Sequence, residues 1–353
     1  MTSKPENIIV VKREKIFFSY AIRLISFFAV VLFHFNMAIV QFYPNSMMLG
    51  KLNYLNQTVG DMAISLFIIT SGFSLEMSTR GNFDLKKYLA KRIISIYPAF
   101  WICYLIVGVL LFLNSGHING DGEHWKLLLS FIGLDGFFLY KMQNYYLVGE
   151  WYTGYMLITY LIFPFLLLGL RFNPAITAII VLTLFALTYL NYNKLFDVYI
   201  NCNPLTRLPD FLFGMIFSRY IYSKKSTFYI SGLMSLFIII TIQAFTKIIP
   251  SQLYMLIFGC CLYCLLAVAF DFLKEVKILA LITPYLAGFT FTAFLLHHQI
   301  IYFLFERLDY SSMTKFEAYY LFFIICFLSF ISAYIINPFI YRLEKALSKT
   351  LIK

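Results

Sequence analysis

Apolar runs of about twenty residues recur along the whole chain, and they constrain its fold more than any other feature. A helix needs ~20 apolar residues to cross the hydrocarbon core of a bilayer. Of the 353 residues, 61% are hydrophobic and 13% are charged, whereas soluble domains are roughly 45–50% apolar and about 25% charged. A soluble fold of this size could not bury so much apolar surface. The sequence therefore predicts an all-α, polytopic membrane protein.

Ten such runs predict about ten transmembrane helices in a single domain, residues 1–353, since no internal repeat or low-complexity tract divides the chain. The stretch 127–140 is shorter and contains Asp135 between two glycines, so we expect an interfacial or re-entrant segment there. The first run is too long for a signal-peptide core and lacks a small-residue cleavage pattern, so we expect it to stay in the membrane. The predicted spans lie near residues 16–40, 58–78, 93–113, 151–170, 174–191, 205–222, 227–246, 252–270, 279–305 and 317–341.

The basic residues indicate the orientation of these spans. The net charge is +11, and the Lys and Arg side chains cluster between the apolar runs. With both termini in the cytoplasm, nineteen of the 28 basic residues fall on the inner side and eight on the outer side, and Arg23 lies within a span. This bias follows the positive-inside rule. We therefore expect a multi-pass protein of the inner (cytoplasmic) membrane with cytoplasmic N and C termini, and no binding of nucleic acid.

Neither the cysteines nor the outer-loop histidines indicate a metal site. Five of the six cysteines fall inside apolar runs, where Cys is usually a small buried hydrophobe. His117 and His124 lie in the long outer loop near two acidic residues, where a solvated loop is the commoner arrangement. The sequence therefore predicts no metal.

The first run contains two ionisable residues, Arg23 and His34. Ionisable groups within a span cost roughly 2.5–3.5 kcal/mol each and are functional candidates. A spacing of eleven residues puts both on one face of a helix, ~16 Å apart along its axis. An arginine near the inner leaflet can hold a phosphate-bearing cofactor, and an imidazole can act as a general base near neutral pH. The alternatives are a snorkelling arginine and a histidine that only packs between helices.

Further motifs follow these two residues in a fixed order. Residues 71–73 read SGF, residues 91–98 read KRIISIYP, and Trp151 stands 13 residues before Pro164. Residues 207–214 read RLPDFLFG, and residues 290–297 read TFTAFLLH. Together with the Arg23 and His34 pair, this set over residues 23–298 resembles the acyltransferase-3 family, integral membrane enzymes that O-acylate carbohydrates.

The resemblance implies an O-acyltransferase that moves an acyl group from cytoplasmic acyl-CoA, with acetyl-CoA as the usual donor. The acceptor would be a hydroxyl of a cell-surface glycan or lipid-linked glycan, such as O-antigen, capsule or exopolysaccharide. His34 would be the catalytic residue, and the cofactor-binding residues would be Arg23, Arg92, Lys91 and Tyr97. Basic residues at the cytoplasmic face attract the phosphates of coenzyme A, although a positive-inside loop alone would explain most of the charges between residues 86 and 92.

On the outer side, the implied substrate-binding residues are Trp151, Glu150, Arg207 and His297. The alternatives are an interfacial aromatic belt for Trp151 and an outer anchor for Arg207. His297 and His298 occupy adjacent faces of one helix, so we expect only one of them, His297, to face the catalytic histidine.

Three positions depart from the family pattern. The family carboxylate that follows the tryptophan falls at Met156, and Glu150 is our candidate for a partial substitute. The third basic position of the basic stretch is Ser95, and the late "H.P" reads His297, His298 and Gln299. Because of these departures, the resemblance predicts the acceptor less specifically than it predicts the fold.

Several alternatives stay open at this point. A transporter or flippase of lipid-linked glycans could line its path with Arg23, Arg207 and His34, although transporters often show two related halves and none are visible here. A membrane glycan polymerase or a scaffold for polysaccharide export would also be rich in spans. Within the acyltransferase hypothesis, the acyl group could be succinyl, and the transfer could be direct or pass through acyl-His34.

Overall fold

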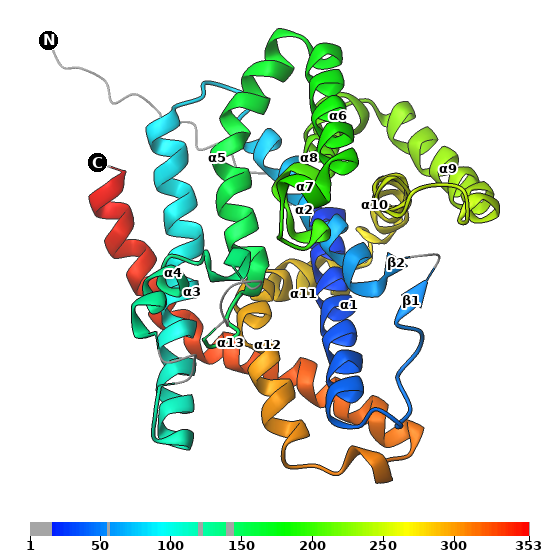
Figure 1. Cartoon of the computed structure of the whole chain (residues 1–353). Helices are drawn as coiled ribbons and strands as arrows, with labels where there is room; N and C mark the ends of the chain where they lie inside the picture. The colour runs from blue at the N-terminus through cyan, green and yellow to red at the C-terminus, as the bar shows by residue number, and fades with distance from the viewer. Residues whose placement is uncertain (1–15, 55–56, 119–122, 139–144, 353) are drawn as a thin grey trace, which may run out of the picture.

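The computed structural model describes residues 16–54, 57–118, 123–138 and 145–352 (Figure 1). Its architecture is all-helical, and the strands within these ranges are one short antiparallel hairpin, β1 (Asn53–Tyr54) and β2 (Gln57–Thr58). The long helices are α1 (Phe17–Phe42), α2 (Val59–Ser78), α3 (Leu85–Ser115), α5 (Glu150–Phe172), α6 (Pro174–Leu190), α8 (Pro204–Ile216), α9 (Lys225–Ile242), α10 (Ser251–Leu273), α11 (Lys277–Ala287), α12 (Thr290–Phe305) and α13 (Lys315–Leu351). The short ones are α4 (Leu127–Phe131) and α7 (Tyr192–Leu195), and a π-helical segment, Phe217–Tyr222, continues α8.

The predicted all-α, polytopic membrane architecture is confirmed. Seven single helices are long and apolar enough to cross a membrane, namely α1, α2, α3, α5, α9, α10 and α13, and the pair α11 and α12 makes an eighth. Large apolar side chains on their outer surfaces are exposed, among them Leu113 at 74%, Phe165 at 75% and Phe172 at 86%. Such a surface needs lipid around it.

All ten predicted ranges coincide with helical segments, but not all of these qualify as spans. Helix α6 has 17 residues, and α8 has 13 before its hydrogen bonding changes to the π-helical pattern. By length and composition the described residues therefore contain seven or eight candidate spans rather than ten.

The predicted span 279–305 is interrupted instead of being one continuous helix. The chain bends by 66° between α11 and α12, at Gly288 and Phe289. Pro284 weakens the end of α11, because proline lacks the backbone N–H and clashes with the preceding turn. Interrupted helices at membrane depth are tolerated where the freed backbone lines a cavity, and this break does line one.

The segment 127–138 is folded against α3 instead of spanning. It contains only the five-residue helix α4 and a 3-10 turn, Asp135–Phe138. The indole N–H of Trp101 donates to the Phe131 carbonyl at 2.9 Å, and the Tyr97 hydroxyl donates to the Ile132 carbonyl at 3.2 Å. A helix of this length cannot cross a bilayer.

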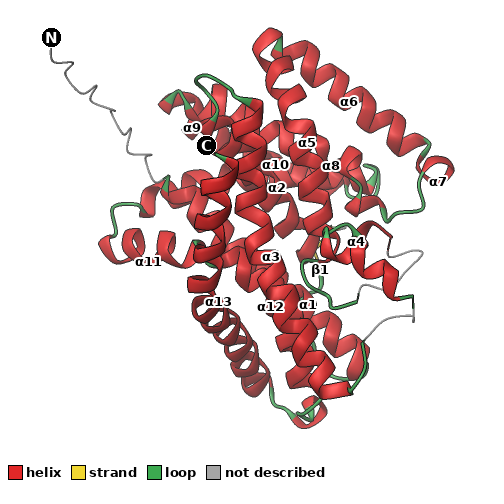
Figure 2. Ribbon diagram, turned by 90° about the vertical axis from the view of Figure 1, so that its left-hand side faces the viewer, coloured by secondary structure: helices red, strands yellow, loops and turns green. Residues whose placement is uncertain are grey.

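Helices α2 and α8 approach each other more closely than ordinary side chains allow. A Cβ atom on Gly72 would collide with the Phe211 carbonyl oxygen, and one on Gly214 with the Ile69 carbonyl oxygen. Small residues let helix backbones pack this closely in membranes. The glycines of SGF and RLPDFLFG therefore have a structural role at one contact, while α13 lies alongside α3 and α12 on the other side of the molecule (Figure 2).

Candidate active site

A cavity of about 420 Å³ lies where α1, α2, α3 and α5 meet the break between α11 and α12. Arg23 of α1 and Arg92 of α3 both line it. Four serine hydroxyls also line it, those of Ser71, Ser74, Ser78 and Ser95. The packing of the helices thus brings together two predicted cofactor-binding residues from different parts of the sequence.

Neither guanidinium group forms an ion pair with a carboxylate in the ranges that the structure describes. Arg23 Nη2 donates to Ser74 Oγ at 2.9 Å. The Arg92 guanidinium lies over the Tyr160 ring at 5.4 Å, and its buried Nε–H has no hydrogen-bond partner there. Cations inside a membrane protein are costly without a counter-charge. The cavity is therefore suited to an anionic ligand.

The break between α11 and α12 adds to this positive character. Gly288, Thr290 and Phe291 line the cavity, so the N-terminus of the 16-residue helix α12 lies at its wall. A helix N-terminus carries unsatisfied N–H groups and a partial positive charge, which together favour phosphate and other anions.

The other end of the cavity is aromatic. Phe67, Tyr152 and Phe294 line it, and the Tyr152 ring centroid lies 6.1 Å from that of Phe67 and 5.4 Å from that of Phe294. The Phe294 ring in turn lies 5.3 Å from the His297 ring. His34 is not among the lining residues, and Phe294 connects these three rings, the aromatic layer, to the imidazoles.

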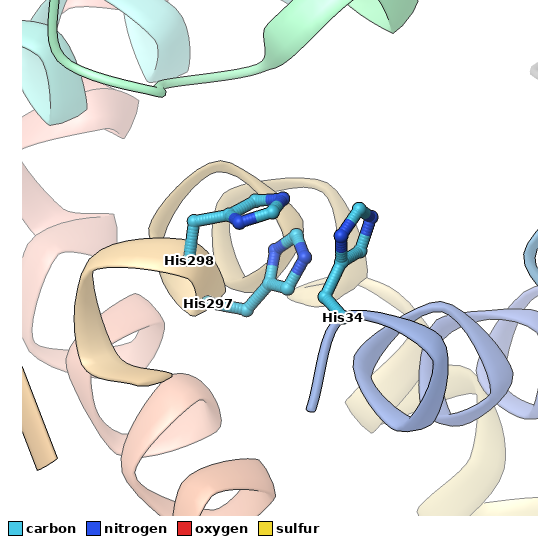
Figure 3. Close-up of side chains that lie close together, drawn as sticks. All are labelled: His34, His297 and His298. Atoms are coloured by element: carbon cyan, nitrogen blue, oxygen red, sulfur yellow. The ribbon is translucent and has the colours of Figure 1, made fainter. Parts of the chain in front are cut away.

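Three imidazole rings gather beyond the aromatic layer (Figure 3). The His34 ring of α1 lies with its centroid 5.1 Å from that of His297 and 4.0 Å from that of His298, both of α12. The expectation that only one of the two would face His34 is therefore wrong. Successive helical residues point about 100° apart, and α12 packs so closely on α1 that both side chains reach the same neighbour.

A hydrogen bond defines the tautomer of His297. Its Nδ1 lies 2.5 Å from the Phe294 carbonyl oxygen. A carbonyl oxygen can only accept, so Nδ1 carries the proton, and a neutral ring has its lone pair on Nε2. The ring itself is fully buried.

Arg207 is buried instead of facing a substrate, with 1% of its surface exposed. Its Nη2 donates to Ser65 Oγ of α2 at 3.0 Å, and its Nε lies 4.0 Å from the carboxylate of Asp210. It does not line the cavity with Arg23 and Arg92. Its contacts hold α8 against α2, so its part in the site is indirect.

Tyr97, Lys91 and Trp151 do not line the cavity. Tyr97 bonds to the segment 127–138 as described above, and Lys91 is exposed. Trp151 packs against the rings of Tyr152 and Tyr155, each at 6.0 Å. The side chain of Glu150 lies outside the described residues.

Helix α5 contributes other residues that the sequence analysis did not assign. Tyr152, Thr153, Met156 and Tyr160 all line the cavity. Met156 therefore places a thioether in the wall at the position of the family carboxylate. Tyr152, Met156 and Tyr160 recur every four residues, and this helical spacing was the available signal. It identifies them only once the buried face of α5 is known.

A second and larger cavity, of about 830 Å³, lies between the β-hairpin and the loops that precede α8 and α10. Its wall is polar at all but one position: Asn53, Gln57, Thr58, Asp61, Tyr189, Tyr199, Asn201, Thr246, Ser251 and Gln252, with Ile200 as the exception. Asn201 Nδ2 donates to Asp61 Oδ1 at 2.8 Å, and Gln252 Nε2 donates to Asn201 Oδ1 at 2.5 Å. Asp61 and Gln252 lie in the first turns of α2 and α10, and Asn201 lies in the 3-10 turn before α8, so no local pattern in the sequence marks them.

The polar cavity lies near the His34 end of α1. Thr58 and Asp61, two of its lining residues, flank Gly60. A Cβ atom on Gly60 would touch the ring of Phe33, the residue that precedes His34. The polar cavity therefore lies near the His34 end of α1, whereas the cavity with Arg92 lies near the Arg23 end.

Comparison with known proteins shows the family of the chain. A family model described as an acyltransferase domain matches residues 19–338, which include both guanidinium groups and all three imidazoles. Acyltransferase MdmB of Streptomyces mycarofaciens is 31% identical over 103 residues, which are 29% of this chain and 26% of that protein. The match therefore spans about a quarter of that relative. No solved structure matches the chain. Because the family model covers nearly the whole sequence, the chain belongs to the acyltransferase-3 family.

Proposed function

We propose that this protein is an acyltransferase that moves an acyl group, acetyl in the first instance, from cytoplasmic acyl-CoA to a hydroxyl of a cell-envelope glycan. The glycan would be an O-antigen, a capsule, an exopolysaccharide or a lipid-linked precursor. The observation that supports this most strongly is the cavity with Arg23 and Arg92, which have no carboxylate partner among the described residues.

Coenzyme A fits the character of this cavity. Its phosphates are anionic, and a guanidinium group binds phosphate through paired, charge-assisted hydrogen bonds. Arg23, Arg92 and the N-terminus of α12 supply positive charge, and the serine hydroxyls supply further polar partners. The positive-inside bias of the sequence puts this end of α1 at the cytoplasm, where acyl-CoA is available.

The aromatic layer defines the path of the acyl group. The pantetheine arm is uncharged, so it can pass between Phe67, Tyr152 and Phe294 while the phosphates stay at the guanidinium groups. The thioester then reaches the imidazoles, which begin at His297 directly behind Phe294.

His34 acts as the general base in this proposal. Its imidazole accepts the proton of the acceptor hydroxyl while the oxygen attacks the thioester carbonyl carbon. The tetrahedral intermediate collapses, the C–S bond breaks, and the departing thiolate takes the proton from the imidazolium. The products are the O-acyl ester and free coenzyme A. His297, fixed by the Phe294 carbonyl, holds the neighbouring ring in position.

The polar cavity is the proposed site of the acceptor. Carbohydrates need many hydrogen-bond donors and acceptors in their binding sites, and the ten polar side chains of this cavity supply them. Its position beside Gly60 and Phe33 brings a bound glycan to the level of His34.

Radiolabelled acetyl-CoA tests the proposal directly. Purified protein in lipid nanodiscs should transfer label to envelope glycan extracted from cells that lack this protein, and His34→Ala should fold but transfer nothing. Full activity of the His34→Ala protein would reject His34 as the base. A glycan whose O-acyl content is the same with and without the protein would reject the acceptor, and an acyl group trapped on His34, detected by mass spectrometry, would replace direct transfer by a two-step route.

A further inference from the structure

The three imidazoles have the geometry of a metal site. Each of His34, His297 and His298 offers one ring nitrogen, and these three nitrogens lie within 4.8 Å of one another. Three nitrogens bound to zinc at 2.0–2.1 Å in tetrahedral geometry are separated by about 3.3 Å. Small rotations about the side-chain torsions close this difference, because the rings already converge from α1 and α12 (Figure 3).

The surroundings of His297 match those of a metal ligand. Histidines that bind metals usually donate their other N–H to a carbonyl or carboxylate, which fixes the ring and its tautomer. His297 Nδ1 makes this bond to the Phe294 carbonyl, so Nε2 is the nitrogen available for coordination. His298 is 5% exposed and His297 is fully buried, so both rings are shielded from bulk water.

We infer that His34, His297 and His298 form a site for a divalent transition-metal ion, zinc foremost. Imidazole nitrogen suits zinc and its neighbours in the first transition row, whereas magnesium and calcium require oxygen ligands. Three histidines around zinc leave a fourth position open. The sequence predicts no metal, because it indicates only His297, and not His298, as a neighbour of His34.

Metal binding would exclude base catalysis by the same ring. A neutral imidazole has a single nitrogen lone pair, so His34 cannot coordinate zinc and accept a proton at once. Zinc should therefore inhibit acyl transfer. This consequence rests on the proposed function, whereas the binding of the metal does not.

Metal binding is measured without any assay of activity. Full-length protein in nanodiscs, stripped with EDTA and dialysed against micromolar Zn²⁺, should retain one zinc per chain by mass spectrometry of the metal. Co²⁺ at the same site should give the visible absorption bands of tetrahedral cobalt. His298→Gln should weaken zinc binding by more than about tenfold, while His117→Gln, which removes an exposed outer-loop histidine, should leave it unchanged.

Two controls distinguish loss of the metal site from misfolding. The thermal midpoint of the metal-free His298→Gln protein shows whether it is folded, and His297→Gln provides a second ligand variant. Added zinc should raise the midpoint of the wild type and of neither variant. Zinc content below one per chain in the wild type, or content that both variants retain, would overturn the site.

The metal site and the proposed function can fail separately. Transfer by a wild-type protein that binds no zinc would reject the site and leave the function standing. One zinc per chain in a protein that transfers no acyl group would reject the proposed function and leave the metal site standing. Where both hold, zinc lowers the transfer rate and EDTA restores it.

Discussion

The guanidinium groups of Arg23 on α1 and Arg92 on α3 face one cavity, and neither is paired with a carboxylate in the described ranges. The two residues differ in their partners. Arg23 donates to Ser74, whereas the Arg92 guanidinium lies over the rings of Tyr88 and Tyr160, and its buried Nε–H has no acceptor among the described residues. The Arg92 guanidinium should therefore gain more free energy than that of Arg23 from hydrogen bonds to a bound phosphate.

Replacement of Arg92 by glutamine should therefore weaken the binding of acyl-CoA and have little effect on the chemical step. A hydrogen bond to a charged group contributes roughly 1.5–3 kcal/mol, so the KM for acyl-CoA should rise about 10- to 100-fold. Steady-state kinetics with acetyl-CoA as the varied substrate measures this. Arg342→Gln, at an exposed position near the end of α13, is the matched control. A fall in kcat at unchanged KM would place Arg92 in the chemistry instead.

The aromatic layer should separate the donor cavity from water at the imidazoles. Phe294→Ala removes the ring that lies between the cavity and His297, so water should reach the thioester and the ratio of acyl-CoA hydrolysis to transfer should rise. Release of free thiol and labelling of the glycan, followed in one reaction, give that ratio. Loss of a buried phenylalanine also costs roughly 3–5 kcal/mol, so the assay belongs well below the unfolding temperature. Phe323→Ala, on the exposed face of α13, should leave the ratio unchanged.

The close contact of α2 and α8 makes a prediction about stability alone. Gly72→Ala places a methyl group on the Phe211 carbonyl oxygen, and backbone atoms cannot move aside as a side chain can. Overpacking of this kind costs typically 1–3 kcal/mol, so the thermal midpoint in detergent should fall by several degrees. Gly81→Ala is the control, because a Cβ atom there meets no atom within 4 Å. Equal midpoints for Gly72→Ala and the wild type would show that the two helices do not pack this closely.

Much of the helix pattern and part of the site could be predicted from the sequence. Length and hydropathy locate helices, since one segment of chain carries the whole signal. The spacing of Arg23 and His34 defines a common face for the same reason, and the basic stretch identifies Arg92. Each of these predictions depends on residues within one helix.

The features of the fold and site that the sequence did not predict all depend on how two or more segments pack together. The break at Gly288 turns α12 so that its N-terminus lines the donor cavity. The pairing of His298 with His34 depends on how α12 packs on α1. Arg207 was expected at the outer surface because it begins a helix, but the glycine contact between α2 and α8 buries it. Helical periodicity gives the faces of a helix and not the partner that each face meets.

Asp135 should make the stability of the protein depend on pH. It lies outside the membrane-spanning helices and is 2% exposed, and burial raises the pKa of its carboxyl from the usual 3.8 to about 6, although the Ser130 hydroxyl at 3.0 Å favours the charged form. The folded state therefore holds a proton that the unfolded chain releases near pH 3.8, and stability falls as the pH rises from about 4 through 6. The loss is on the order of 3 kcal/mol, since one pKa unit corresponds to about 1.4 kcal/mol.

Asp135→Asn removes this titration and keeps a side chain that can accept the bond from Ser130. The thermal midpoint of the wild type should fall relative to that of Asp135→Asn as the pH rises from about 4 through 6, and the difference should then become constant. Asp309→Asn serves as the control, because hydrogen bonds from Ser311 lower the pKa of that exposed carboxyl, which therefore stays charged throughout this range. Parallel midpoints for the wild type and Asp135→Asn across the range would mean that Asp135 is ionised in the folded protein, and that water reaches the segment 127–138 where it folds against α3.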